Sequence, residues 1–155
     1  MPLREQPECV GFFAGHFEQE WPAWYGPGGQ GSAIADLTEF ANSAGDLPVG
    51  VVARADDGSY VGVAALKATS IPEFAHFSPW AGAGFVLPSL RRRGIGAALL
   101  SGLLAEARRL KFPFVYCATA TAASLLERQG WQLLERAKHD GNPIDIYSTP
   151  VSLRG

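Results

Sequence analysis

The segment from Gly84 to Leu99, GFVLPSLRRRGIGAAL, most constrains the fold of this chain. An apolar run typical of a buried strand stops at Pro88, three arginines follow, and an amphipathic helix begins at the glycines. The first N–H groups of a helix have no partner inside it, and its N-terminus carries positive partial charge. This order therefore predicts an anion site that suits a diphosphate.

Glycines in and before this loop strengthen the interpretation. Gly94 and Gly96 in the first helical turn cost about 1 kcal/mol each relative to alanine. Gly82 and Gly84 in the preceding strand are typical of a bulge or of close ligand approach. A basic loop that merely starts a helix is the alternative, but several unfavourable choices in one place favour a functional site.

Helical periodicity dominates the first part of the chain. It predicts a helix over residues 7–20, which Pro22 ends or kinks, and then a glycine-rich loop over 25–31. Ser32 is expected to cap a second helix, which Gly45 would stop. The buried side of this helix is expected to carry Ile34, Leu37, Phe40 and Ala41.

Strands alternate with helices in the remainder. Asp57-Gly58 predicts a hairpin, and Thr121 is expected to cap a short helix that ends at Gly130. A second hairpin is expected at Asp140-Gly141-Asn142. The predicted strands are 49–53, 60–66, 81–87, 114–118, 131–137 and 144–148, and a long helix runs from Ile95 to Lys111. Hairpins and β-α-β crossovers together predict an α+β fold, with a mixed sheet flanked by helices in three layers.

Bulk properties narrow the function classes. A length of 155 residues predicts a single domain over 1–155, and a net charge of −2 gives no electrostatic footprint for nucleic acid. The N-terminus lacks a signal-peptide core and no apolar run spans a bilayer, so we expect a cytoplasmic protein without membrane contact. Cys9 and Cys117 have no metal-ligand spacing, and Cys117 is expected to be a buried strand residue rather than a nucleophile.

The motif Arg91-x-x-Gly94-x-Gly96 resembles the (Arg/Gln)-x-x-Gly-x-(Gly/Ala) signature of the GNAT superfamily of N-acetyltransferases. The element order and the Gly130-Trp131 pair extend this resemblance over roughly residues 7–148. It implies the GNAT acyl-coenzyme A N-acyltransferase fold with a mostly antiparallel sheet, acetyl-coenzyme A as acetyl donor, and a primary amine as acceptor. Only 2–5 remain for the family's first strand, which we expect to be short or missing.

The resemblance also implies which residues hold the coenzyme. Backbone groups of the strand would follow the pantetheine arm, N–H groups of the loop would hold the pyrophosphate, and the strand ending near Thr119 would splay away to open a cleft. The expected contacts are Phe85, Val86, Leu87, Arg91, Arg92, Arg93, Gly94, Ile95, Gly96, Ala97 and Thr119.

Catalysis needs a neutral amine, a donor for the oxyanion and a departing thiolate. A lysine-type amine, with a pKa of about 10.4, is neutral in roughly one molecule in two thousand near pH 7, so a general base matters more for it than for an α-amine. His76 is the first candidate base and Glu73 the next, both in the loop before the cofactor strand, although either is equally a surface residue.

The acid step departs from the family pattern. Many relatives carry a tyrosine four residues before the Gly-aromatic pair, where this chain has Leu126, and the usual asparagine is replaced by Thr119 or a neighbour. A thiol with a pKa of about 8.5 leaves with little help. Tyr116, Tyr147 or a water could supply the proton.

Three functions are therefore weighed. The first is acetyl transfer to a small amine, amino acid, antibiotic or peptide N-terminus, in a chain that forms a homodimer. The second is a non-catalytic module that binds acyl-coenzyme A, motivated by Leu126. The third, a nucleotide-phosphate enzyme, ranks low because the chain has no GxxxxGK[ST]. Aromatic side chains of 21–25 and 74–80 are expected to shape the acceptor pocket, although Trp21 and Trp24 favour the core.

Overall fold

The computed structural model describes residues 1–42, 45–139 and 141–151. Its central element is a six-stranded sheet. The strand order is β1-β2-β3-β4-β6-β5, and every neighbouring pair is antiparallel except β3 and β4, which are parallel. The strands are β1 Val49–Arg54, β2 Tyr60–Lys67, β3 Trp80–Val86, β4 Phe114–Thr119, β5 Gln132–His139 and β6 Asn142–Pro150. The expected mixed, mostly antiparallel sheet is confirmed.

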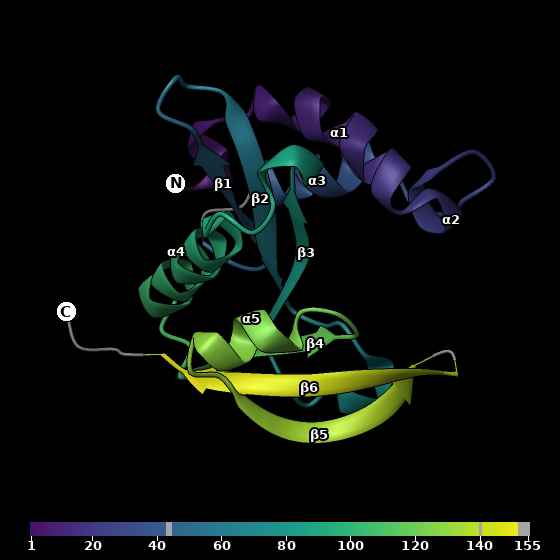
Figure 1. Ribbon diagram of the computed structural model, residues 1–155, viewed down its shortest axis with the longest axis vertical. Coiled ribbons are helices and arrows are strands. Elements are labelled where there is room, and N and C mark those ends of the chain that lie inside the picture. The colour runs from purple at the N-terminus through teal and green to yellow at the C-terminus, as the bar shows by residue number, and fades with distance from the viewer. Residues whose placement is uncertain (43–44, 140, 152–155) are drawn as a thin grey trace.

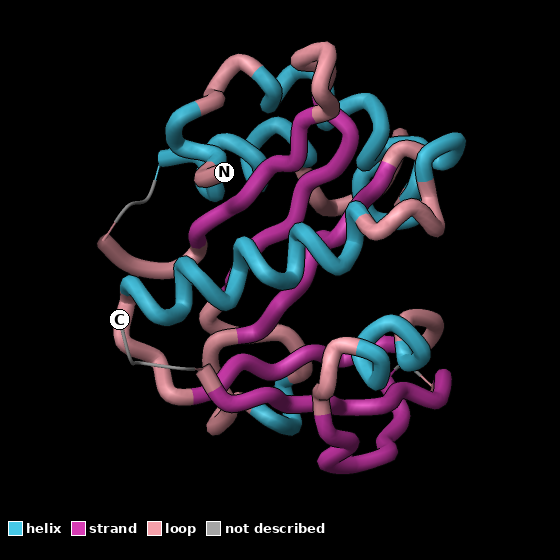
Figure 2. Tube along the Cα trace, turned by 60° about the vertical axis from the view of Figure 1, so that its left-hand side comes forward, coloured by secondary structure: helices cyan, strands magenta, loops and turns pink. Residues whose placement is uncertain are grey.

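Helices cover both faces of this sheet (Figure 1). The helices are α1 Cys9–Glu20, α2 Pro22–Tyr25, α3 Ala33–Asn42, α4 Ile95–Arg109 and α5 Ala123–Arg128. The first three lie on one face, where α1 and α3 enclose one apolar core with the sheet, and α4 and α5 enclose a second core on the other face. The tube in Figure 2 shows α4 crossing the strands of the N-terminal half. No described helix is long and apolar enough to cross a membrane.

The helix signals of the N-terminal part hold with one exception. Pro22 ends α1 and occupies the first turn of α2, where its missing N–H costs nothing, and Ser32 Oγ accepts a bond from Ala35 N–H at 3.2 Å. Ile34 is 51% exposed, so the prediction that it is buried was wrong. Ala33 and Leu37 occupy the buried stripe instead, and Ile34 lies about 100° further round the helix. The predicted stop at Gly45 follows residues 43–44, which lie outside the described part.

The turns also follow the sequence, except at α5. Gly58 has φ +89° in the turn between β1 and β2, and Ala55 N–H donates to the Ser59 carbonyl at 2.9 Å. The predicted cap of α5 at Thr121 was wrong. The N-cap position is Ala122, and Thr119 Oγ1 at the end of β4 accepts bonds from the N–H groups of Thr121 and Ala122 at 3.2 and 2.7 Å in the turn before the helix. The second hairpin includes Asp140, which lies outside the described residues.

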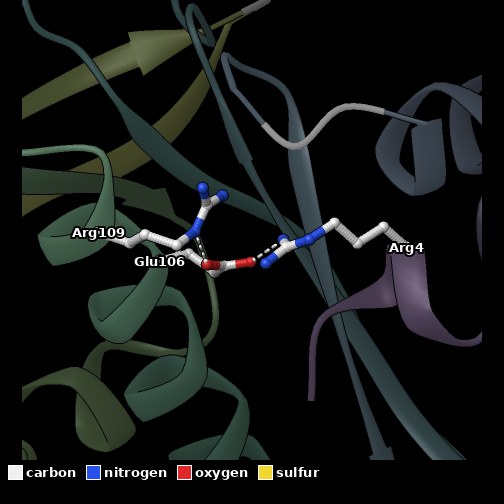
Figure 3. A network of polar contacts seen from close by, with 3 residues as sticks. All are labelled: Arg4, Glu106 and Arg109. Atoms are coloured by element: carbon white, nitrogen blue, oxygen red, sulfur yellow. Dashed lines mark hydrogen bonds and ion pairs between the residues drawn. The ribbon is translucent and has the colours of Figure 1, made fainter.

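The short first strand is reduced to a single bridge between Pro2 and Val51, followed by a 3-10 turn over Leu3–Glu5. Glu106 of α4, 5% exposed, fixes this segment by accepting bonds from Arg4 Nη1 at 2.5 Å and Arg109 Nε at 2.7 Å (Figure 3). Burial alone would raise the pKa of Glu106, but bonds to the two guanidinium groups outweigh it and hold this pKa below its usual value.

Candidate functional site

The parallel strands β3 and β4 touch at one end and then part. Their only pairing among the described residues is Trp80 with Tyr116, while β4 pairs along its whole length with β6. In Figure 1, β3 rises away from β4, which runs beside β6. The expected splay is therefore present, and it leaves backbone groups of β3 beyond Trp80 without a partner strand on one side.

A bulge in β3 lies beside this opening. Val63 of β2 pairs with Phe85 and Ala65 with Gly82, so two residues of β3 lie opposite one of β2, and Ala83 takes φ +52°. The bulge that the two glycines suggested is confirmed. It re-aims the backbone of β3 next to the place where β4 departs.

The alternation of the antiparallel ladder decides which groups of β3 face the opening. Leu87 N–H donates to the Val61 carbonyl at 3.0 Å, so the paired residues Gly62 and Val86 direct their backbone groups away from each other. The Val86 N–H thus points to the side of β4, and its carbonyl accepts a bond from Arg91 Nε at 2.9 Å. Of the three strand residues predicted to follow the pantetheine arm, Val86 presents a free donor, whereas the N–H of Leu87 is already used.

The loop after β3 ends in a helix terminus with free donors. The first bond of α4 runs from Ala98 N–H to the Gly94 carbonyl at 3.1 Å, so the N–H groups of Ile95, Gly96 and Ala97 precede the ladder. The N-cap residue is Gly94, which has no side chain that could cap these N–H groups. Arg92 has φ +68° and Gly94 has φ +84°, and this curvature wraps the loop around the terminus. The geometry is that of an anion site.

The two motif glycines have separate structural reasons. Gly94 needs its left-handed φ of +84°, which a side chain disfavours. A Cβ at Gly96 would lie 3.1 Å from Leu125 Cδ2, so the glycine lets α5 approach α4. A Cβ at Gly94 would meet nothing within 4 Å, which leaves the approach to the terminus open.

The three arginines of the loop divide into two roles. Arg92 and Arg93 are exposed and form no ion pair among the described residues, so both charges are available to a phosphate. The Arg91 guanidinium is engaged elsewhere: it lies 5.5 Å from the centroid of the Phe85 ring and 3.2 Å from Glu20 Oε2 of α1. Arg91 therefore connects the loop to α1. Because its side chain is engaged there, only its backbone remains for the predicted contact with coenzyme A.

Phe85 marks the opposite face of β3. Its ring is 3% exposed and lies 5.4 to 6.5 Å from four ring centroids of α1 and the residue after it. These neighbours are Phe13, His16, Phe17 and Trp21. Sequence reasoning missed His16, because a histidine within an apolar helical stripe carries no signal of its own until the strand that it faces is known.

A polar group lies on the same side of the sheet. Tyr25 O–H donates to Asp36 Oδ2 at 2.6 Å, and burial, with help from this carboxylate, raises the pKa of Tyr25. Burial lowers the pKa of Lys67 at the end of β2, while the charge of Asp36 acts in the opposite direction. Trp24 is 50% exposed, so the expectation that it belongs to the core was wrong, whereas Trp21 is partly buried.

The predicted catalytic residues lie at the closed end of the splay. Tyr116 is in the pair that joins β3 to β4, and the Phe77 ring stacks on it at 4.5 Å. His76 is exposed, with its ring 4.2 Å from that of Phe77, and Glu73 is exposed on the 3-10 turn Pro72–Phe74. The structure thus brings both His76 and Tyr116 against the ring of Phe77. Their catalytic roles remain predictions.

At the position where many relatives carry a tyrosine, this chain has no hydroxyl, because the residue there is Leu126. Leu126 is 1% exposed in the core between α4, α5 and the sheet. Tyr147 O–H donates to Glu127 Oε1 at 2.9 Å, and this bond raises the pKa of Tyr147. Burial raises the pKa of the Cys117 thiol to about 12, so Cys117 is not a thiolate nucleophile at neutral pH.

Comparison with known proteins agrees with this geometry. Residues 13–131 match the model of the acetyltransferase (GNAT) family, so the chain belongs to this family. It is an acetyl-coenzyme A-dependent acetyltransferase by family, as the resemblance implied, and the expected fold class is confirmed. No curated protein sequence matches the chain.

Solved structures share the fold at low identity. An aminoglycoside 6'-N-acetyltransferase complexed with coenzyme A is 14% identical with a TM-score of 0.74, covering 96% of this chain and 94% of that one. The aminoglycoside 6'-N-acetyltransferase from Enterococcus faecium is 15% identical, with a TM-score of 0.72 and the same coverage. A phosphinothricin acetyltransferase from Sinorhizobium meliloti, in complex with acetyl-coenzyme A, is 22% identical with a TM-score of 0.64, covering 79% and 71%.

Proposed function

We propose that this enzyme acetylates a primary amine of a small molecule or peptide, and that the amine attacks the thioester of acetyl-coenzyme A directly in a ternary complex. The observation that carries the proposal is the parting of β3 and β4 beyond Trp80 and Tyr116. Free backbone donors lie at one end of this opening, together with two arginines that form no ion pair with the residues that the structure describes. Aromatic and polar side chains lie on the other face of β3.

The residues present fit coenzyme A. The N–H groups of residues 95–97, with Arg92 and Arg93, would hold the diphosphate, and Val86 N–H would bond the pantetheine arm as an added strand does. Acetyl-coenzyme A supplies an activated acyl carbonyl. A backbone N–H of β3 beside the bulge would donate to the oxygen of that carbonyl, where charge develops during attack.

Two histidines are candidates for the base that deprotonates the amine. His76, with Glu73 beside it on the same loop, is the one that sequence reasoning proposed. His16 is the second, supported by its ring contact of 5.4 Å with Phe85 of the cofactor strand and by its partial burial. Both would act directly or through one water.

Protonation of the departing thiolate depends less on side chains than deprotonation of the amine does. Leu126 supplies no proton, and Tyr147 already donates to Glu127, so Tyr116 and solvent remain for the departing sulfur. A thiol with a pKa of about 8.5 departs as thiolate near neutral pH without an acid. The proposal therefore predicts turnover despite the missing tyrosine.

The test is a thiol-release assay with acetyl-coenzyme A and a panel of amines that includes aminoglycosides, amino acids and peptide N-termini. Acetylated product by mass spectrometry in at least one case is the expected result. Tight coenzyme A binding by calorimetry with no product from any amine would instead support the second candidate, a non-catalytic acyl-coenzyme A module, which the burial of Leu126 favours.

A homodimer remains part of the proposal, with a cytoplasmic location. The edge strand β5 exposes Leu133 and Leu134 by 41% and 47%, which supports association along this edge. A Leu134→Glu variant that lowers the mass measured by light scattering to that of a monomer would support this arrangement. A wild-type protein that is already monomeric at high concentration would contradict it.

A further inference from the structure

Lys67 reaches over β3 on the face opposite α4. It ends β2 beside Trp80, and its Nζ lies 5.8 Å from the centroid of the Phe40 ring of α3. A Cβ built on Gly82 would lie 3.9 Å from this Nζ, which places the ammonium beside Gly82, the residue that precedes Ala83 of the bulge. The ammonium therefore lies on the acceptor side, close to where β3 and β4 part.

This ammonium has no hydrogen-bond acceptor and no ion pair among the residues that the structure describes. Asp36 is the carboxylate that acts on it electrostatically, but Asp36 accepts the Tyr25 hydroxyl bond and forms no ion pair with Lys67. Lys67 is partly buried, so it has lost water without gaining a direct partner. Such a cation favours an anionic ligand that replaces its lost hydration.

Glycines line the backbone of β3 beside the Lys67 ammonium. The three atoms nearest to a Cβ at Gly82 all belong to Lys67, and a Cβ at Gly84 would meet nothing within 4 Å. The two glycines flank Ala83, so a small polar group can approach the backbone of the bulge from this side. A ligand whose anionic group pairs with Lys67 would hold an adjacent amine near the bulge.

We propose that Lys67 determines acceptor specificity by binding a carboxylate, so that the preferred substrates are amines that carry one, such as α-amino acids. This inference rests on the proposed acetyl transfer. It separates the chain from the aminoglycoside acetyltransferases that share its fold, because a second cation beside Lys67 is repelled.

The test compares matched acceptors in the thiol-release assay: the common α-amino acids against their carboxamides, which keep the amine and lose the charge. We expect the wild type to favour the best amino acid over its carboxamide by about 10- to 100-fold in kcat/KM. Lys67→Met should raise KM for the acid far more than KM for the carboxamide and so remove the preference. Lys67→Arg should restore part of the preference.

The control is Lys138→Met, which removes an exposed lysine of β5 and should leave the preference intact. A wild type without preference for the acid, or a Lys67→Met variant that keeps it, overturns the inference. If coenzyme A binds but no amine is acetylated, the proposed transfer fails separately. The same amino acids are then titrated into the coenzyme A complex by calorimetry, where binding that Lys67→Met abolishes supports the inference and equal or absent binding overturns it.

Discussion

The two sides of β3 offer different chemical groups to a substrate. Towards β4 and the start of α4 the strand and the following loop offer mostly backbone: the N–H of Val86 and those of residues 95–97, with Arg92 and Arg93 as added charge. Towards α1 and α3 the same strand offers side chains from separate elements. The first face suits a ligand common to a whole family, and the second can differ between members without disturbing the fold.

The backbone character of the coenzyme face gives the largest expected effect. Gly94→Val with Gly96→Val imposes a β-branched residue at φ +84° and a Cβ 3.1 Å from Leu125. We expect the Kd for coenzyme A to rise by about 100- to 1,000-fold, because left-handed strain and overpacking cost about 1 to 3 kcal/mol each. Isothermal titration calorimetry measures it, with circular dichroism to verify folding.

Gly141→Val is the matched control, since Gly141 has φ +80° in the far hairpin. It should share the strain and leave the Kd unchanged. A double variant that still binds coenzyme A within twofold of the wild type would exclude the α4 terminus from the coenzyme site.

The second largest effect is expected from the histidine on the acceptor side of β3. His16→Gln should lower kcat by about 100-fold with a lysine-type acceptor, but only by about 10-fold with an α-amine, because the α-amine is neutral far more often near pH 7. Steady-state rates with both acceptors across the pH range test this. His76→Gln is the parallel variant, and whichever histidine flattens the neutral limb is the base. If neither variant changes the pH–rate profile, neither histidine is the general base.

Removing charge from the coenzyme face should cost less than distorting its backbone. Arg92→Ala with Arg93→Ala should weaken coenzyme A binding by about 10-fold at low salt and by less at high salt, because both side chains are exposed and screened. Arg108→Ala, at the other end of α4, is the control. A loss as large as that of the glycine variant would reverse the ranking of backbone over side chains.

The smallest effect is on stability. Glu106→Gln should lower the free energy of unfolding by about 1 to 2 kcal/mol near pH 7, a moderate cost since Arg4 and Arg109 are themselves 25% and 38% exposed. The folded-state pKa of Glu106 is lowered, so its contribution is complete above the unfolded carboxyl pKa of about 4.3 and disappears as pH falls through the folded value.

Urea unfolding at neutral and acidic pH measures this difference, and Glu39→Gln on the exposed side of α3 is the control. The stability gap between wild type and Glu106→Gln should close in acid. Acceptor preference should stay the same in both, since Glu106 contacts neither face of β3. A gap that persists unchanged in acid would show that the carboxylate charge contributes nothing.

The difference between the faces also explains what the sequence could predict. The coenzyme loop was readable because its glycines and arginines are consecutive and each is a costly choice. Hairpin signals such as Asp57-Gly58 depend only on local backbone geometry, and they hold. His16 and Lys67 could not be read in the same way, because 50 residues of chain lie between them and only the folded sheet brings both to one side.

Errors arose where two neighbours compete for one role. Ile34 and Ala33 are adjacent, and apolarity favours the wrong one, because the phase of the α3 stripe depends on where the helix meets the sheet. Thr121 suits a cap by residue type, but Thr119 of β4 bonds the N–H groups of Thr121 and Ala122, and the helix begins only after Ala122. Tertiary contact decides both cases, and no local pattern contains that information.

Arg91 joins the two faces and so couples the two substrates energetically. Its guanidinium bonds the Val86 carbonyl, lies over Phe85 and pairs with Glu20 of α1. Any shift of the loop on coenzyme A binding would therefore act on the helix that carries His16. Thermodynamic linkage requires the reverse: whatever the first ligand changes in affinity for the second, the second changes equally for the first. We therefore expect coenzyme A and the acceptor to change each other's affinity by the same factor, and this factor to approach one when Arg91 is lost.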